Sequence, residues 1–382
     1  MISTIAIIII VIYLLLIGYL TYGFDKVIHF KLQDLPAKTK FSVVIPFRNE
    51  AENLPKLLAS ILKLNYPKSL FEIILVDDDS QDDSVAIIQK VIDASRKNRD
   101  TKTDAITIIR NVRVSNSPKK DAITSAIKVS QFNWIITTDA DCILPKYWLS
   151  AYDEYIQSKN TNCIVAPVTY HSNTSFFKRF QTLDFLSLQG ATIGAFGIKK
   201  PIMCNGANFG YRKSIFHHVN GFDGNTDISS GDDVFLLEKF IKYDAKKVHY
   251  LKSQKAIVTT NPTPTVPNLI QQRLRWASKT TNYTNWFTKL IGLVVLLGNL
   301  ICLTFIPLVL FNLLDTKTAI ALFFIKFSID FLLVFKTSRF FKQDTLLGSY
   351  PVSGLLYPFF NVGVVFLSFF KTYRWKGRTS KK

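Results

Sequence analysis

Two aspartates follow a short apolar run near the middle of the chain. The segment WIITTDADCILP, residues 134–145, places Asp139 and Asp141 directly after the run from Trp134 to Thr138. Apolar and β-branched residues in such a run are typical of a buried strand, so both carboxylates should lie where this strand leaves its sheet. Neighbouring carboxylates repel one another unless a cation lies near them, and a hard divalent ion is the usual partner. The alternative is a polar turn in which Asp141 caps the next helix.

A second acidic strand end lies earlier in the chain. The segment FEIILVDDDS, residues 71–80, reads as a strand that ends in Asp77, Asp78 and Asp79. Asp77 and Asp78 can accept hydrogen bonds from a base N–H or from ribose hydroxyls, or all three aspartates can form an acidic turn that caps the next helix. Parallel sheets bind ligands outside the carboxyl ends of their strands, so two acidic ends in one sheet favour a binding site.

The elements around both segments alternate between strand and helix. This alternation, with short connections, is typical of an α/β fold in which a mostly parallel sheet carries helices on both faces. The expected strands cover residues 41–47, 71–80, 105–111 and 134–141, and the expected helices cover 49–64, 82–97 and 119–130.

Apolar segments bracket this α/β region. Residues 1–24 carry no charged side chain and exceed the roughly 20 apolar residues that a membrane span needs. Further apolar blocks cover residues 290–314, 318–335 and 346–370, and prolines in the last block suggest a segment that re-enters the membrane or lies at its surface. One N-terminal and two or three C-terminal transmembrane helices are therefore expected. The expected domains are a transmembrane helix at 1–24, a cytosolic domain at 25–285 with an interfacial segment near 268–285, a transmembrane or re-entrant region at 290–371, and a basic tail at 372–382.

The charge of +19 is concentrated beside the apolar blocks. Basic residues next to membrane spans mark the cytoplasmic side and attract anionic lipid, whereas a nucleic-acid-binding protein would carry them on its soluble domain. We therefore expect a membrane partner and no nucleic acid. The expected location is a bacterial inner membrane with the α/β domain in the cytoplasm. The four cysteines lack metal-ligand spacing, and reduced thiols are the simplest account of them.

Six motifs in order resemble those of a known family. They are VVIPFRNEAENL, LVDDDSQDDS, TTDAD, CNGANFGYRKSIFHHVNGFD, SSGDDVFLLEKF and QQRLRW, and together they span residues 41–276. Their order and the flanking apolar segments resemble the membrane-bound family 2 glycosyltransferases. That family includes cellulose, chitin and hyaluronan synthases and sugar transferases that act on lipids. The resemblance implies a GT-A domain that binds a nucleotide-diphosphate sugar and transfers the sugar with inversion.

The resemblance also implies roles for particular residues on the donor side. Asp139 and Asp141 correspond to the Asp-x-Asp pair that binds the diphosphate together with Mg²⁺ or Mn²⁺. Lys119 and Lys120 stand where the family often has a basic residue before a helix, and they either meet phosphate or lie at a solvated helix start. The implied nucleotide pocket consists of Pro46, Asn49, Glu50, Asp77 and Asp78.

The remaining motifs concern the acceptor and the chemical step. The loop Asn205, Gly206, Ala207 and Asn208 resembles the acceptor side, and Asp233 corresponds to the catalytic base with Asp232 as its acidic neighbour. Both aspartates are also well suited to capping the following helix.

The last motif, Gln272, Arg275 and Trp276, matches Gln-x-x-Arg-Trp, with Arg273 as an additional cation. Arg275 can neutralise the leaving diphosphate and Trp276 can stack on a sugar, and an amphipathic interfacial helix is the alternative.

The chain departs from the family pattern at two positions. Asp79 stands where many relatives have glycine, and Phe235 stands where many have an acid. A non-glycine residue at position 79 needs a backbone dihedral that aspartate tolerates.

Three functions follow from these observations. The leading one is transfer from a nucleotide-diphosphate sugar, with UDP favoured, to a lipid-linked or short glycan acceptor in the synthesis of cell-envelope glycans or glycolipids. A processive polysaccharide synthase is the alternative within the same chemistry. An inactive membrane scaffold that only binds nucleotide sugar belongs to another class. The oligomeric state and the identity of the sugar are left open.

Overall fold

A computed structural model describes residues 1–97, 105–171, 175–228, 230–279, 282–375 and 378–380. The chain divides into two compact units. The sheet unit comprises Ile28–His171 and Met203–Asn261, and the helical unit comprises Met1–Val27, Ser172–Ile202 and Pro262–Lys382. The predicted 25–285 domain thus contributes segments to both units.

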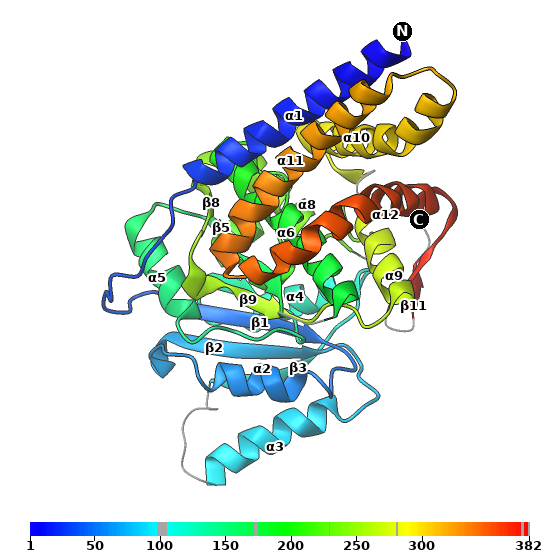
Figure 1. Cartoon of the computed structure of the whole chain (residues 1–382). Coiled ribbons are helices and arrows are strands. Elements are labelled where there is room, and N and C mark those ends of the chain that lie inside the picture. The colour runs from blue at the N-terminus through cyan, green and yellow to red at the C-terminus, as the bar shows by residue number, and fades with distance from the viewer. Residues whose placement is uncertain (98–104, 172–174, 229, 280–281, 376–377, 381–382) are drawn as a thin grey trace. The chain divides into compact units, whose positions relative to one another are not determined.

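The sheet unit is built on a seven-stranded sheet with the order β3-β2-β1-β4-β7-β5-β8. The neighbouring strands β1 and β2 are labelled in Figure 1. The pairs β1–β2, β2–β3, β1–β4 and β5–β8 are parallel, whereas β7 runs antiparallel to β4 and β5. The strands are β1 (Phe41–Phe47), β2 (Phe71–Asp77), β3 (Ile106–Arg110), β4 (Trp134–Thr137), β5 (Cys163–Val165), β7 (Phe209–Arg212) and β8 (Val248–Tyr250). Two further strands, β6 (Val168–Tyr170) and β9 (Val258–Thr260), pair separately.

Helices connect and cover these strands. α4 packs on β1 and β2, and α2 packs on α3. The helices of this unit are α2 (Leu54–Ile61), α3 (Ser84–Lys97), α4 (Pro118–Val129), α5 (Trp148–Ser158), α7 (Lys213–His218) and α8 (Val234–Asp244). The four predicted strands and three predicted helices between residues 41 and 141 are confirmed, although α2 begins five residues later than expected because the segment before it forms a turn.

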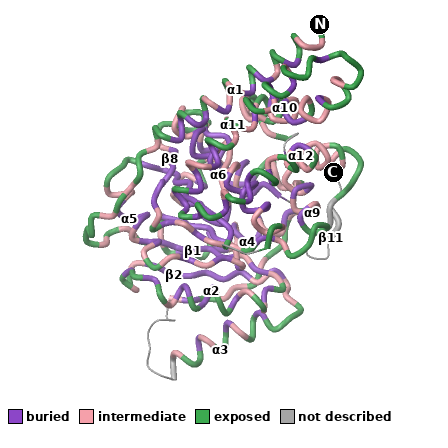
Figure 2. Tube along the Cα trace, viewed as in Figure 1, coloured by how far each residue is buried: buried purple, intermediate pink, exposed green. Residues whose placement is uncertain are grey.

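The central strands are buried along almost their whole length, as the purple trace of β1 and β2 in Figure 2 shows. Only Pro46 in β1 and Glu72 and Asp77 in β2 are half-buried. Side chains on both faces of such strands must be apolar, which explains the near-continuous apolar runs in the sequence.

The helical unit contains the apolar blocks and two helices that lie between them in the sequence. Four segments are long and apolar enough to cross a membrane, namely Ile2–Lys26, Trp286–Leu310, Thr316–Phe341 and Asp344–Phe370. The helices are α1 (Ile2–Lys26), α6 (Phe176–Gly197), α9 (Val266–Ala277), α10 (Trp286–Leu310), α11 (Thr316–Phe341) and α12 (Tyr350–Phe370), followed by the strands β10 (Tyr373–Trp375) and β11 (Arg378–Ser380). The last apolar block thus forms a continuous helix that contains Pro358.

α6 packs on both α1 and α11, so it belongs with the long apolar helices. Gly23 of α1 lies against the backbone carbonyl of Gly194, and a Cβ atom on either glycine would overlap the other helix's backbone. Small residues at a crossing let two helix backbones approach closely, which is how helices associate where lipid surrounds them.

A charge pair inside α11 is also satisfied within this unit. Lys326 and Asp330 are joined at 2.7 Å, and the hydroxyl of Tyr13 donates to the same carboxylate at 2.7 Å. Charged groups inside an apolar helix are tolerated when they pair with one another. Lys326 and Asp330 are four residues apart, so they lie on the same face of α11 and can pair.

Candidate active site

The loops that follow β1 and β2 are joined by hydrogen bonds. The backbone N–H of Asn49 donates to the Ser80 hydroxyl at 3.1 Å, and Asn49 Oδ1 accepts from the backbone N–H of Gln81 at 2.8 Å. The N–H of Glu50 donates to Ser84 Oγ at 2.8 Å. Asn49 has a φ of +51°, a left-handed conformation that asparagine tolerates better than most residues. Both loops therefore form one rim at the carboxyl ends of the two strands.

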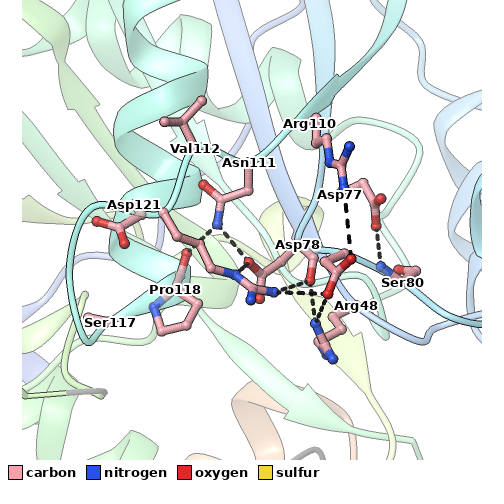
Figure 3. Close-up of polar contacts among 12 residues, drawn as sticks. Arg48, Asp77, Asp78, Ser80, Arg110, Asn111, Val112, Ser117, Pro118 and Asp121 are labelled. Atoms are coloured by element: carbon pink, nitrogen blue, oxygen red, sulfur yellow. Dashed lines mark hydrogen bonds and ion pairs between the residues drawn. The ribbon is translucent and has the colours of Figure 1, made fainter.

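Asp78 lies at the centre of a group of cationic side chains on this rim (Figure 3). Its Oδ1 accepts from Arg113 Nε at 2.6 Å and from Asn111 Nδ2 at 2.8 Å. Its carbonyl oxygen accepts from Arg113 Nη2 and from Arg48 Nη1, both at 2.7 Å. The hydrogen bond to Asp78 raises the pKa of Arg113 above its ordinary value, against the partial burial of the guanidinium. Neither arginine was among the residues predicted from the sequence.

The neighbours of Asp78 have separate roles. Asp77 Oδ1 accepts from the backbone N–H of Ser80 at 3.0 Å, which stabilises the turn after β2. Asp79 has a φ of +66°, so its backbone has the left-handed conformation that is expected where many relatives have glycine. The half-buried Pro46 lies beside Val76 in the parallel pair of β1 and β2.

Lys119 joins two of the predicted acidic groups. Its Nζ lies 2.8 Å from Asp139 Oδ1 and 3.1 Å from Asp232 Oδ2. Burial disfavours the charge of Lys119, but the two carboxylates outweigh this effect and raise its pKa above the ordinary value. The carboxylates that follow β4 and precede α8 are thus brought together around one ammonium group.

Lys120 points elsewhere, although it is adjacent in sequence. Its side chain is fully buried, and Nζ donates to the carbonyl oxygens of Asn225 and Ile228 at 2.5 and 2.8 Å. It therefore fixes the backbone of the loop that leads to Asp232 and Asp233.

Asp233 lies at the first turn of α8. Its Oδ1 accepts from the Val234 N–H at 2.8 Å, so it caps the helix, and its Oδ2 accepts from the Gly206 N–H at 3.1 Å. A Cβ on Gly206 would lie 2.9 Å from Asp232 Oδ2 and 3.3 Å from Lys119 Nζ. A side chain at position 206 would therefore crowd the acidic cluster.

The rest of the predicted acceptor loop faces the protein. Asn205 Oδ1 accepts from the Ala207 N–H at 3.0 Å, and Ala207 is buried. Asn208 is fully buried: its Oδ1 accepts from Trp148 and Tyr152 at 2.9 Å, and its Nδ2 donates to two backbone carbonyls at 2.8 Å. All hydrogen-bonding capacity of that amide is used inside the core, so Asn208 supports the loop from below.

Asp141 lies two residues beyond Asp139, and the Cys142 thiol lies 3.8 Å from its Oδ1. Burial raises the pKa of the Cys142 thiol, as do the charges of Asp141 and Asp139, so this cysteine stays protonated. All four cysteines are free thiols, as expected. Among the described residues, no group of three or more His, Cys, Asp or Glu side chains is arranged to hold a metal ion.

The Gln-x-x-Arg-Trp residues lie on α9 in the helical unit, where Gln272, Arg275 and Trp276 are half-buried. Arg273 is buried and contacts both Gln272 and Trp276.

Comparison with protein families gives two overlapping matches. A model of glycosyl transferase family 2 matches residues 42–219, and one of glycosyl transferase family group 2 matches residues 134–335, which is more than half of the chain. The chain belongs to glycosyl transferase family 2. Its mostly parallel α/β sheet is the one expected for a domain of this family.

Individual relatives are distant or cover short segments. The poly-β-1,6-N-acetyl-D-glucosamine synthase of Staphylococcus epidermidis is 23% identical over 62% of this chain and 53% of its own length. The poly(ribitol-phosphate) β-N-acetylglucosaminyltransferase TarS of Staphylococcus aureus is 41% identical over only 13% of this chain and 9% of its own. The chain thus spans about half the length of the first relative and much less of the second.

One solved structure shares the fold over nearly the whole chain. It is the mannosyltransferase PcManGT from Pyrobaculum calidifontis, in complex with GDP-Man and Mn²⁺, with a TM-score of 0.55 and 14% identity. The similarity covers 93% of this chain and 99% of that one. At this identity the likeness concerns the fold, and it agrees with the predicted GT-A class.

Proposed function

We propose that this glycosyltransferase is an inverting membrane enzyme that transfers a sugar from a UDP-sugar to a lipid-linked or short glycan acceptor. The main support is the cluster of Asp139, Lys119, Asp232 and Asp233 around Gly206, at the carboxyl end of β4. This is where parallel sheets bind ligands. Because two curated relatives are named for N-acetylglucosamine chemistry, UDP-N-acetylglucosamine is the first donor to test.

The nucleotide is assigned to the rim after β1 and β2. Hydrogen-bonded loops and converging arginines make this rim pre-organised, which reduces the entropy lost on binding. Asp77, Asp78, Asn49, Glu50 and Pro46 belong to this pocket in the proposal, with Arg48 and Arg113 added.

The residues present fit a divalent ion. Mg²⁺ usually keeps several waters and is held by one or two carboxylates together with substrate phosphates, so Asp139 and Asp141 suffice once the donor supplies its diphosphate. The Asp139 side chain is 36% exposed, which leaves it accessible to the donor. Bound Mg²⁺ or Mn²⁺ would stabilise negative charge on the leaving diphosphate. Lys119 can take part of that charge as a second cation.

Asp233 is assigned as the general base. The acceptor hydroxyl must lose its proton as it attacks the anomeric carbon on the face opposite the leaving diphosphate, and a carboxylate can accept that proton. The backbone N–H groups of Val234 and Gly206 hold the Asp233 carboxylate in place at this end of the sheet. Asp232, held by Lys119, is its charged neighbour.

The proposed orientation places the sheet unit in the cytoplasm, where nucleotide sugars are made. Lys26 ends α1 and Lys31, Lys38 and Lys40 follow it, and basic residues at this end of a span favour the cytoplasmic side. An inner bacterial membrane is the proposed location.

The decisive experiment is transfer by purified protein in detergent with a panel of nucleotide sugars and native lipids, scored by product mass. A lipid or short glycan that gains one sugar supports the proposal. A ladder of many added sugars supports the processive alternative, which the match to a polysaccharide synthase favours. Donor binding without transfer or hydrolysis for every sugar in the panel would support the scaffold instead.

A further inference from the structure

Two buried polar side chains of α6 hold the segment that carries the Gln-x-x-Arg-Trp residues. Gln181 is fully buried, and its Oε1 accepts from the N–H and the hydroxyl of Thr263, both at 2.9 Å. Its Nε2 donates to the Thr263 carbonyl at 3.0 Å. These three hydrogen bonds fix the chain three residues before α9 begins.

Asp184, three residues further along α6, fixes α9 near its other end. Its Oδ2 accepts from Arg273 Nε at 2.9 Å and from Arg273 Nη2 at 2.5 Å. The side chains of both residues are only 6% exposed. A buried charge without its partner is costly, so each of these side chains strongly constrains the other.

Arg273 also contacts two residues of the motif and so restricts their side chains. Its Nη1 donates to Gln272 Oε1 at 2.6 Å, and its guanidinium lies 4.1 Å from the centre of the Trp276 ring. The Trp276 ring also packs against Phe185, the residue after Asp184, with a centroid distance of 6.1 Å. A planar guanidinium can serve a carboxylate, an amide and an aromatic face at once, which a lysine ammonium cannot.

We propose that Asp184 is a positioning residue for sugar transfer, and that it acts through Arg273 to hold the Gln272 and Trp276 side chains in their working orientation. The inference rests on the proposed function and on the part in transfer that the family resemblance implies for the Gln-x-x-Arg-Trp motif. It assigns α6 a function as the platform for that motif and gives Arg273 a role separate from that of Arg275. Poor positioning of a group that contacts substrate lowers the rate without unfolding the protein.

The competing explanation is that the pair only stabilises the helical unit. The two explanations differ for a double variant, Asp184→Leu with Arg273→Met. Replacing a buried ion pair by apolar residues of similar size often preserves or improves stability. A purely stabilising pair can therefore be replaced with no loss of turnover, whereas a positioning pair cannot.

The experiment compares turnover and thermal stability in detergent, with UDP-N-acetylglucosamine or whichever donor the panel identifies. We expect the double variant to express and melt like the unmodified protein but to turn over about 10- to 100-fold more slowly. Adding Trp276→Ala to it should lower the rate by much less than Trp276→Ala does alone, because the ring is already misplaced. The control is Lys326→Met with Asp330→Leu and Tyr13→Phe, which replaces another, partly buried ion pair of the same unit together with the hydroxyl that donates to it, and should leave turnover unchanged.

A second variant keeps the test valid if the double variant does not fold. Arg273→Lys retains the charge opposite Asp184 but cannot reach Gln272 and cover Trp276 together, so turnover should again fall while the protein stays folded. Normal turnover in Arg273→Lys or in a folded double variant, combined with a slow Trp276→Ala, would overturn the inference and leave the proposed function standing. Normal turnover in Trp276→Ala would instead remove the proposed role of the motif, and the inference with it.

Discussion

Lys119 occupies a position between Asp139 and Asp232 in which it neutralises a ligand of the proposed divalent ion. An ammonium 2.8 Å from a carboxylate competes with any other cation for the same oxygen atoms. Donor-free protein should therefore bind metal weakly, and the diphosphate, which attracts Lys119, should strengthen metal binding.

This competition predicts opposite effects of Lys119→Met on two ligands. Mn²⁺ should bind more tightly in the absence of nucleotide, because Asp139 is released, and UDP should bind more weakly, because a cation is lost. Electron paramagnetic resonance of free Mn²⁺ measures the first effect and calorimetry the second. Lys128→Met, at an exposed position on the same helix, is the control. Mn²⁺ affinity equal to that of the unmodified protein would argue against the competition.

Substitution of Asp233 should affect the chemical step without affecting donor binding. General-base catalysis is typically worth about 10²–10⁴ in rate, so Asp233→Asn should lower turnover by at least 100-fold while metal-dependent UDP affinity stays nearly unchanged. Asp232→Asn should cost less. Steady-state kinetics with UDP calorimetry tests both variants, and retention of a tenth of the normal turnover in Asp233→Asn would identify another residue as the base.

The left-handed backbone at Asp79 gives a prediction about stability. This conformation destabilises a residue that has a Cβ atom by about 1–2 kcal/mol, and aspartate reduces that cost through local hydrogen bonds. Asp79→Val should therefore lower the melting temperature clearly more than Asp79→Gly does. Its ion pairs with Arg48, Arg110 and Arg113 are 3.4 to 3.9 Å long and the Asp79 side chain is 46% exposed, so their loss in Asp79→Gly should cost little. Equal melting temperatures of the two variants would show that the backbone strain is absent in solution.

At the scale of elements, α6 differs from the strands and helices that the sequence predicts. The strands and helices between residues 41 and 141 were predictable because each has a single regular pattern. α6 was not, because Thr182, Asp184, Gln189 and Thr192 are buried among its apolar residues and blur the helical period. The aspartates at the strand ends were also predictable, because each group directly follows a strand with a regular pattern. Arg113 and Arg48 were missed because their partner, Asp78, is distant in sequence and only the fold brings them together.

The crossing of α1 and α6 can be tested through its glycines. Gly194→Val introduces a side chain where the backbone of Leu20 already lies, so the two helices must separate. We expect a strong loss of folded protein, measured by size-exclusion chromatography of detergent extracts. Gly292→Val in α10 is the control, since a Cβ there meets nothing within 4 Å. Equal yields of both variants would show that the close approach is not required.

At the scale of the whole molecule, the number of membrane crossings determines where the basic tail lies. α12 is long enough to span, and four spans with the N-terminus outside would place the tail outside as well. That arrangement conflicts with its many lysines and arginines, which favour the cytoplasm.

Single-cysteine labelling in a cysteine-free background shows on which side of the membrane a residue lies. We expect cysteines at Ser80 and at Lys382, which lies outside the described residues, to react only with reagents that reach the cytoplasm. Labelling from outside at position 382 alone would show that α12 crosses the membrane. Labelling from outside at position 80 would contradict a cytoplasmic donor site.

The contact between Gly23 and Gly194 also bears on how the protein is made. In the proposed membrane arrangement, α1 is made and inserted before residue 194 has been translated, so its glycine face would initially meet lipid. α6 in turn packs through Gly190 on Leu333 and Thr337 of α11, which are synthesised later still. The support for α9 is therefore complete only once α11 has also been made, and an incompletely translated chain would hold the motif residues on an α6 that α11 does not yet support.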